Sequence, residues 1–190
     1  MSIAAALFAL ALTAGYAREP VLLDARCNEL AWTRAERTPI GEGVTLLAMA
    51  DRRYVYLCVT LPPESLGTLD LYIQGETGAP VNLHISAQTG ERTRGENGWR
   101  EWSGFNNYDG WYGPPVAFSG MIEGADGVRR PQFANSQARE LQISRDRFGD
   151  GPWRVMLQVH ALGTARSGGV AYPADGDSND SSTWTSLAFR

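Results

Sequence analysis

The chain lacks lysine altogether, and only two cysteines and two histidines occur among its 190 residues. Its 17 basic side chains are therefore all arginines, and 21 acidic residues outnumber them to give a net charge of −4. This acidic balance argues against a nucleic-acid partner, which would require a basic surface. Two cysteines are too few for a zinc finger or for a small fold held by several disulfides.

The sequence also lacks the short motifs of common enzymes, since no GxSxG, HExxH, P-loop or GxGxxG pattern occurs in it. Two of the three acids Glu96, Glu101 and Asp109 could act as a glycosidase pair. Such a pair needs a defined distance between its two carboxyl groups, which the sequence does not specify. The composition, with 43% apolar residues and six Trp, excludes intrinsic disorder and suits one folded domain. The sequence therefore favours a protein without catalytic activity and leaves an enzyme open.

One short apolar run opens the chain and predicts export. Residues 3–12 (IAAALFALAL) have the length of a signal-peptide core, and small side chains follow at Gly15 and Ala17. Cleavage after Ala17 would remove residues 1–17 and leave a single domain, 18–190, in the periplasm or outside the cell. The alternative is a membrane anchor, but the run is shorter than a membrane span requires. We expect no membrane contact after cleavage.

Export bears on the oxidation state of the two cysteines. In an oxidising compartment Cys27 and Cys58 are expected to form a disulfide. The alternative is a pair of buried thiols.

Most of the remaining chain has the pattern of short strands. One hairpin is predicted by two β-rich runs separated by Asp51 and Arg52, and a second by two runs that alternate apolar and polar residues. Only residues 28–36 have a helical pattern, and residues 89–114 and 123–137 are expected to be irregular. This pattern predicts an all-β antiparallel sandwich or barrel of about 8–10 strands with one short N-terminal helical turn. The expected strands are 43–50, 53–61, 68–74, 80–88, 115–122, 138–144, 153–161 and 183–189.

Several segments, in order, resemble carbohydrate-binding module family 9 and its wider DOMON-like relatives. Leu23-Asp24 and the turn around Trp32 resemble the family's opening "DG…W..A", with Ala25 in place of the Gly. Glu140-Leu141-Gln142-Ile143 resembles "E..IP", with Ser144 in place of the Pro. The stretches VTLLAMADRRYVYLCVTLP, LDLYI, VNLHISAQTGE and TWTSLAF resemble the family's strands. This resemblance implies an immunoglobulin-like sandwich that binds sugars in some relatives and haem in others.

The densest aromatic segment runs from Trp99 to Tyr112 (WREWSGFNNYDGWY). Aromatic rings can stack on the C–H faces of a sugar while amide and carboxylate groups bond its hydroxyls. The alternative is that Trp99 and Trp102 close one end of the sandwich as core residues. The predicted ligand-binding residues are Trp99, Trp102, Asn106, Asn107, Tyr108, Asp109, Trp111 and Tyr112.

A second candidate site is the outward row of the inferred second hairpin. This row could form a concave polar binding face or an ordinary solvated sheet face. It comprises Asp70, Tyr72, Gln74, Asn82 and His84.

A third candidate is a Ca²⁺ loop, because oxygen-bearing side chains alternate there in a D-x-D-x-N pattern. The alternative is a polar loop that ends in a capping turn before the last strand. Its predicted ligands are Asp175, Asp177, Asn179 and Asp180.

Three function hypotheses remain: a carbohydrate-binding protein, a haem-binding electron carrier and a cell-envelope module that binds protein. Haem would need two axial ligands from different strands, because Met156 and His160 on one strand lie about 13 Å apart. The other candidate axial ligands are Met49, Met121 and His84.

Overall fold

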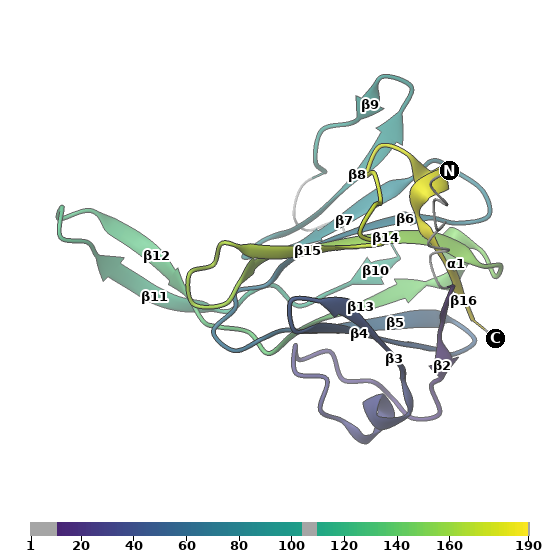
Figure 1. The fold of residues 1–190 in the computed structure, drawn as a ribbon, viewed down its shortest axis with the longest axis horizontal. Helices are drawn as coiled ribbons and strands as arrows, with labels where there is room; N and C mark the ends of the chain where they lie inside the picture. Colours follow the sequence, from purple (N-terminus) through teal and green to yellow (C-terminus); the bar gives the residue numbers. More distant parts are fainter. Residues whose placement is uncertain (1–10, 104–109, 190) are drawn as a thin grey trace, which may run out of the picture.

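The computed structural model describes residues 11–103 and 110–189 (Figure 1). The strands are β1 (Leu12–Thr13), β2 (Gly15–Tyr16), β3 (Glu36–Gly41), β4 (Val44–Ala50), β5 (Tyr54–Thr60), β6 (Thr68–Gln74), β7 (Val81–Ile85), β8 (Thr89–Gly95), β9 (Gly98–Trp99), β10 (Trp111–Tyr112), β11 (Phe118–Glu123), β12 (Arg129–Phe133), β13 (Ala138–Ser144), β14 (Trp153–Leu162), β15 (Gly168–Tyr172) and β16 (Thr185–Ala188). The short helices are η1 (Leu30–Arg34), α1 (Arg145–Phe148) and η2 (Ser181–Thr183).

Two sheets form the sandwich. The eight-stranded sheet has the order β1-β16-β14-β6-β7-β8-β9, with β15 also paired to β14. The six-stranded sheet has the order β10-β13-β5-β4-β2, with β3 also paired to β4. Neighbouring strands within these sheets are antiparallel except β1 with β16 and β2 with β4. The expected all-β sandwich is therefore confirmed.

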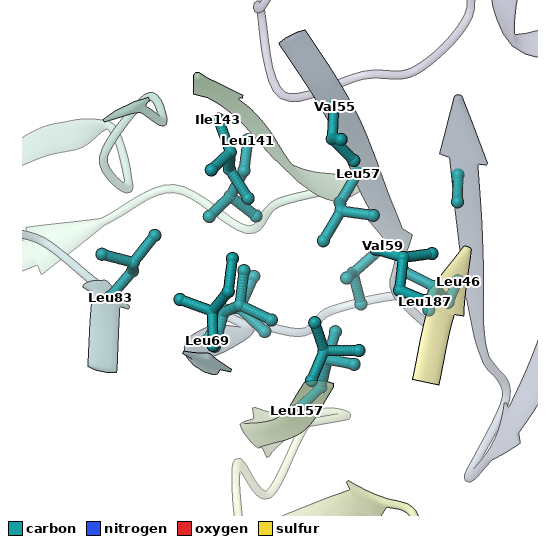
Figure 2. Packing of buried hydrophobic residues seen from close by; sticks show 14 of the residues in the cluster. Leu46, Val55, Leu57, Val59, Leu69, Leu83, Leu141, Ile143, Leu157 and Leu187 are labelled. Carbon is teal, nitrogen blue, oxygen red and sulfur yellow. The ribbon is translucent and has the colours of Figure 1, made fainter. Parts of the chain in front are cut away.

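The main core lies between the sheets because apolar side chains alternate along their strands. Figure 2 shows Leu69, Leu83 and Leu157 of the eight-stranded sheet facing Leu57 and Leu141 of the six-stranded sheet. All five side chains are at most 1% exposed. At about 25 cal/mol per Å² of buried apolar surface, this layer is the main source of stability.

The six-stranded sheet is covered on its outer side as well. The N-terminal segment with η1 crosses this side (Figure 1), and Trp32 packs there against Leu47, Met49 and Tyr56. Strand β5 therefore has buried residues on both faces, as its apolar sequence indicates. The expected helical turn at 28–36 is the shorter 3-10 helix η1.

The two segments expected to be irregular contain strands. Residues 89–95 form β8 beside β7, and β9 and β10 follow it. Residues 129–133 form β12, which pairs with β11 in a two-stranded arm that projects from the sandwich (Figure 1). Neither β8 nor β12 shows apolar alternation, so the period-two pattern that reveals a strand was missing.

The predicted signal peptide overlaps described strands. β1 lies beside β16 and β2 beside β4, and Leu12 is buried in the core. Cleavage after Ala17 stays a prediction, and it would remove both strands. Across residues 11–103 and 110–189, no helix has the length and apolar character needed to cross a membrane.

The expected disulfide joins Cys27 to Cys58, and their Cα atoms are 6.3 Å apart. Cys58 is fully buried on β5, whereas Cys27 belongs to the loop before η1. The bridge therefore fastens the N-terminal segment to the outer side of the six-stranded sheet.

Breaking this bridge should destabilise the protein. The bonded residues are 31 positions apart, and a loop of that size corresponds to about 3–4 kcal/mol of unfolding free energy in the chain-entropy model. We expect the unfolding free energy of the double variant C27A/C58A to be lower than that of the wild type by that amount. The variant should therefore unfold at a lower urea concentration. Reductant should lower the midpoint of the wild type and leave that of the double variant unchanged; equal responses would contradict the prediction.

Candidate functional site

The predicted aromatic segment is divided among three places in the fold. Trp99 and Trp102 lie on the outer face of the eight-stranded sheet, Trp111 lies in the core, and Tyr112 lies at the six-stranded sheet. Asn106, Asn107, Tyr108 and Asp109 were also predicted to bind ligand; these four lie outside the described residues.

Trp111 is a core residue, which corrects its expected place in a ligand-binding loop. Its backbone pairs with Ile143 of β13, and its side chain is 4% exposed. The indole Nε1 donates to Glu91 Oε2 at 2.7 Å. Arg147 donates to both oxygens of the same carboxylate at 2.9 Å. The ring is thus surrounded by protein and has no face free for a sugar.

Tyr112 is 38% exposed but belongs to the six-stranded sheet, whereas the exposed Trp102 lies at the eight-stranded sheet. Together with Tyr54 and Gln142 it lines a hollow of about 210 Å³ at the six-stranded sheet. Two adjacent residues of β10 therefore point to opposite sides, as strand geometry requires.

Trp99 and Trp102 reach the outer face of the eight-stranded sheet through the β8–β9 hairpin. Gly98 turns this hairpin with a φ of 109°, a conformation open to glycine. Trp99 then pairs with Arg94, and Trp102 follows with 41% of its surface exposed. Arg92 of β8 lies over both rings, 5.2 Å from the Trp99 centroid and 4.5 Å from the Trp102 centroid. These cation–π contacts hold the rings beside the sheet.

A polar network continues from Arg92 across the sheet. Arg92 Nε donates to Asn82 Oδ1 at 3.1 Å, and Asn82 Nδ2 donates to Asp70 Oδ1 at 3.3 Å. His84 Nδ1 lies 3.0 Å from the same Asp70 oxygen, and the His84 ring lies 5.4 Å from that of Trp102. Because an ionised carboxylate only accepts hydrogen bonds, Nδ1 donates to Asp70, and Nε2 has no hydrogen-bond partner within the described part of the chain.

Tyr72 is buried at the centre of a cluster of rings on this face. Its ring lies 5.5 Å from that of Trp99, which belongs to β9, and 5.9 Å from that of Trp184, which precedes β16. Its hydroxyl donates to Gln158 Oε1 at 3.1 Å. Burial raises the pKa of Tyr72, and the nearby Asp70 carboxylate adds to the rise, so the hydroxyl stays protonated at neutral pH.

A hollow of about 690 Å³ lies at the free end of the β8–β9 hairpin, lined by residues 94–101. Trp99 contributes to its wall, and its buried Nε1 has no hydrogen-bond partner among the residues that the structure describes. A buried donor without an acceptor is costly, and a ligand or a water with an acceptor oxygen would satisfy it.

The predicted outward row is therefore a partly covered face. Tyr72 and Asn82 are buried, Asp70, Gln74 and His84 are partly exposed, and all but Gln74 join the network or the ring cluster described above. Arg92 and Gln158 were missed as site residues. Gln158 could have been found, because it continues the same outward row on the predicted strand β14. Arg92 could not, because β8 has no apolar alternation from which its outward side could be predicted.

The predicted calcium loop forms a capping turn. Asp177 Oδ1 accepts from the Asn179 amide at 2.8 Å, and Asp180 Oδ1 accepts from the Ser182 amide at 2.9 Å at the start of η2. Hydrogen bonds from Ser182 lower the pKa of Asp180. Asn179 Oδ1 accepts from Arg94 at 3.2 Å, so this loop touches the β8–β9 hairpin. Calcium binding by these residues and Asp175 stays a prediction.

The candidate haem ligands differ in burial and in their place in the fold. Met49 is buried on the outer side of the six-stranded sheet, and Met156 is buried beside Tyr72 and Trp184. Met121 is 48% exposed on the projecting arm. His84 is bonded to Asp70, and haem binding stays a prediction.

Comparison with family models finds no match, and comparison with curated proteins finds none either. Among solved structures, the chain is similar to a candidate carbohydrate-binding protein from Bacteroides uniformis ATCC 8492. The TM-score is 0.55 at 10% sequence identity, and the match covers 94% of this chain and 98% of the other. At this identity the likeness shows the sandwich fold alone.

The different places of Trp111 and Trp102 predict different stabilities for their alanine variants. Trp111→Ala should cost about 3–5 kcal/mol of unfolding free energy, because it leaves a core cavity and removes a donor to Glu91. Trp102→Ala should cost about 1 kcal/mol or less, because the ring is largely at the surface. Urea denaturation followed by circular dichroism measures both, and equal losses would contradict the assignment.

Proposed function

We propose that the protein is an exported, non-catalytic carbohydrate-binding protein whose ligand lies on the outer face of the eight-stranded sheet. The observation that carries the proposal is the exposed Trp102 ring beside His84 and Arg92. An aromatic face next to fixed hydrogen-bonding groups matches a sugar, which has apolar C–H faces and a polar rim.

The surroundings support this proposal. The sheet face is rigid, because Asp70, Asn82 and Arg92 are bonded to one another and Arg92 also lies over two Trp rings. Side chains already held in place lose little freedom when a ligand binds. The hollow of about 690 Å³ that Trp99 lines offers further room for sugar units at the end of the β8–β9 hairpin.

The comparisons and the sequence agree with a sugar ligand. The similar structure from Bacteroides uniformis is described as a candidate carbohydrate-binding protein. We propose membership of the family 9-like and DOMON-like group on the sequence segments quoted above. The Cys27–Cys58 disulfide is compatible with an oxidising compartment, which supports export.

Sugar binding should depend on Trp102. An array of soluble oligosaccharides identifies a ligand, and calorimetric titration then measures its affinity. Trp102→Ala should weaken binding by roughly 30-fold, equivalent to about 2 kcal/mol for a central aromatic contact. Tyr112→Ala is the matched control, because it removes an exposed ring from the other sheet and should leave the affinity unchanged.

Two results would overturn the proposal. One is an array on which no oligosaccharide binds. The other is a Trp102→Ala variant that binds as tightly as the wild type, or a Tyr112→Ala variant that loses affinity in its place.

A further inference from the structure

Three carboxylates from distant parts of the sequence meet on the outer side of the six-stranded sheet. Asp24 and Glu29 belong to the N-terminal segment, and Glu140 belongs to β13. One carboxylate oxygen from each lies within 4.8 Å of the others. The cluster is far from the candidate sugar face, because it lies beneath the segment that covers the opposite side of the sandwich (Figure 1).

The neighbouring structure holds this cluster together. Glu140 pairs in register with Cys58, and Cys58 is bonded to Cys27, between Asp24 and Glu29 in the sequence. The disulfide therefore fixes the loop that carries two of the carboxylates over the strand that carries the third.

The donors around Glu140 leave the cluster with uncompensated charge. Glu140 is fully buried and accepts from the Ala25 amide at 2.5 Å and from Trp32 Nε1 at 3.1 Å. Both donors are neutral. Within the described part of the chain, the ion pairs include none to Glu29 or Glu140, and Asp24 has one long contact of 3.8 Å with Arg26.

Glu29 supplies a separate observation that points to a ligand. Both of its carboxylate oxygens are buried, and neither accepts a hydrogen bond from residues 11–103 or 110–189. A buried carboxylate without a donor costs several kcal/mol unless a cation or a proton compensates it.

We propose that Asp24, Glu29 and Glu140 bind one divalent cation, and that Ca²⁺ is the preferred ion. The ligands are hard oxygen atoms, and the neighbouring Cys27 and Cys58 are joined in the disulfide, so neither offers a thiolate. Ca²⁺ accepts irregular oxygen cages more readily than Mg²⁺, which demands an octahedron. The ion joins the N-terminal segment to β13 beside the disulfide. This cation site is distinct from the 175–180 loop and does not depend on sugar binding.

Calcium should stabilise the chelator-treated protein. Extracellular calcium modules bind with dissociation constants of about 10⁻⁴–10⁻³ M. At about 10 mM Ca²⁺ the folding equilibrium constant should therefore rise roughly 10–100-fold. Urea denaturation with Ca²⁺ or with EDTA measures this change, and calorimetric titration with Ca²⁺ alone should give one ion per chain.

Substitutions assign the ion to these residues. Glu29→Gln removes one charge while keeping the shape of the side chain. It should abolish the response to Ca²⁺ and make the EDTA-treated protein more stable than the wild type, because repulsion falls. Asp177→Asn is the matched control in the other acidic loop and should keep the full response.

Luminescence gives a second readout that does not depend on stability. Tb³⁺ replaces Ca²⁺ at oxygen sites and emits when a nearby indole transfers energy to it. Trp32 donates to Glu140 Oε1, so excitation of tryptophan should produce Tb³⁺ emission that Ca²⁺ displaces. Glu29→Gln should lose this emission, and Asp177→Asn should keep it.

The proposal is overturned if Ca²⁺ neither binds nor stabilises the wild type. It is also overturned if Asp177→Asn loses the calcium response while Glu29→Gln retains it, since the ion then belongs to the 175–180 loop. Loss of sugar binding in Trp102→Ala has no bearing on these results, so the two proposals fail separately.

Discussion

Side chains alternate between two faces along β6, β7 and β14, and this alternation ties the candidate ligand face to the core. Leu71, Leu83 and Leu157 point inward and pack against the other sheet. Their neighbours Tyr72 and His84 must then point outward, where they meet the Trp rings. A slip of one residue would bury the polar network and expose the leucines, so core packing fixes the geometry of the ligand face.

The sequence predicts strands such as β6 and β13, whose inward positions are apolar, and misses β8, whose inward position is polar. β13 was predicted with its observed bounds, and the disulfide was predicted from the two cysteines and the expected export. β8 was missed because its inward residue Glu91 is acidic, and only the pairing with Trp111 and Arg147 makes its burial favourable. The aromatic segment was found, but its division between two sheets depends on the pairing of β10 with β13, which residue spacing does not encode.

The two outer surfaces of the sandwich differ in how far their polar side chains are buried. The N-terminal segment covers the six-stranded sheet and packs Trp32 against it, so Glu140 and the Glu29 carboxylate oxygens are buried there. Trp102 is 41% exposed on the outer face of the eight-stranded sheet, and His84 beside it is partly exposed. Water and ligands can reach these side chains, whereas an ion beneath the N-terminal segment acts on the fold.

One edge of strand β14 pairs first with β16 and then with β15. The chain between β15 and β16 must leave the sheet and return, and it does so over the outer face, where Asn179 meets Arg94 and Trp184 meets Tyr72. Insertions in this segment would change its contacts with Arg94 and Tyr72 without altering the pairing of β14 with β15 or β16. A change of loop length alone would therefore alter this part of the outer face and leave the sheet intact.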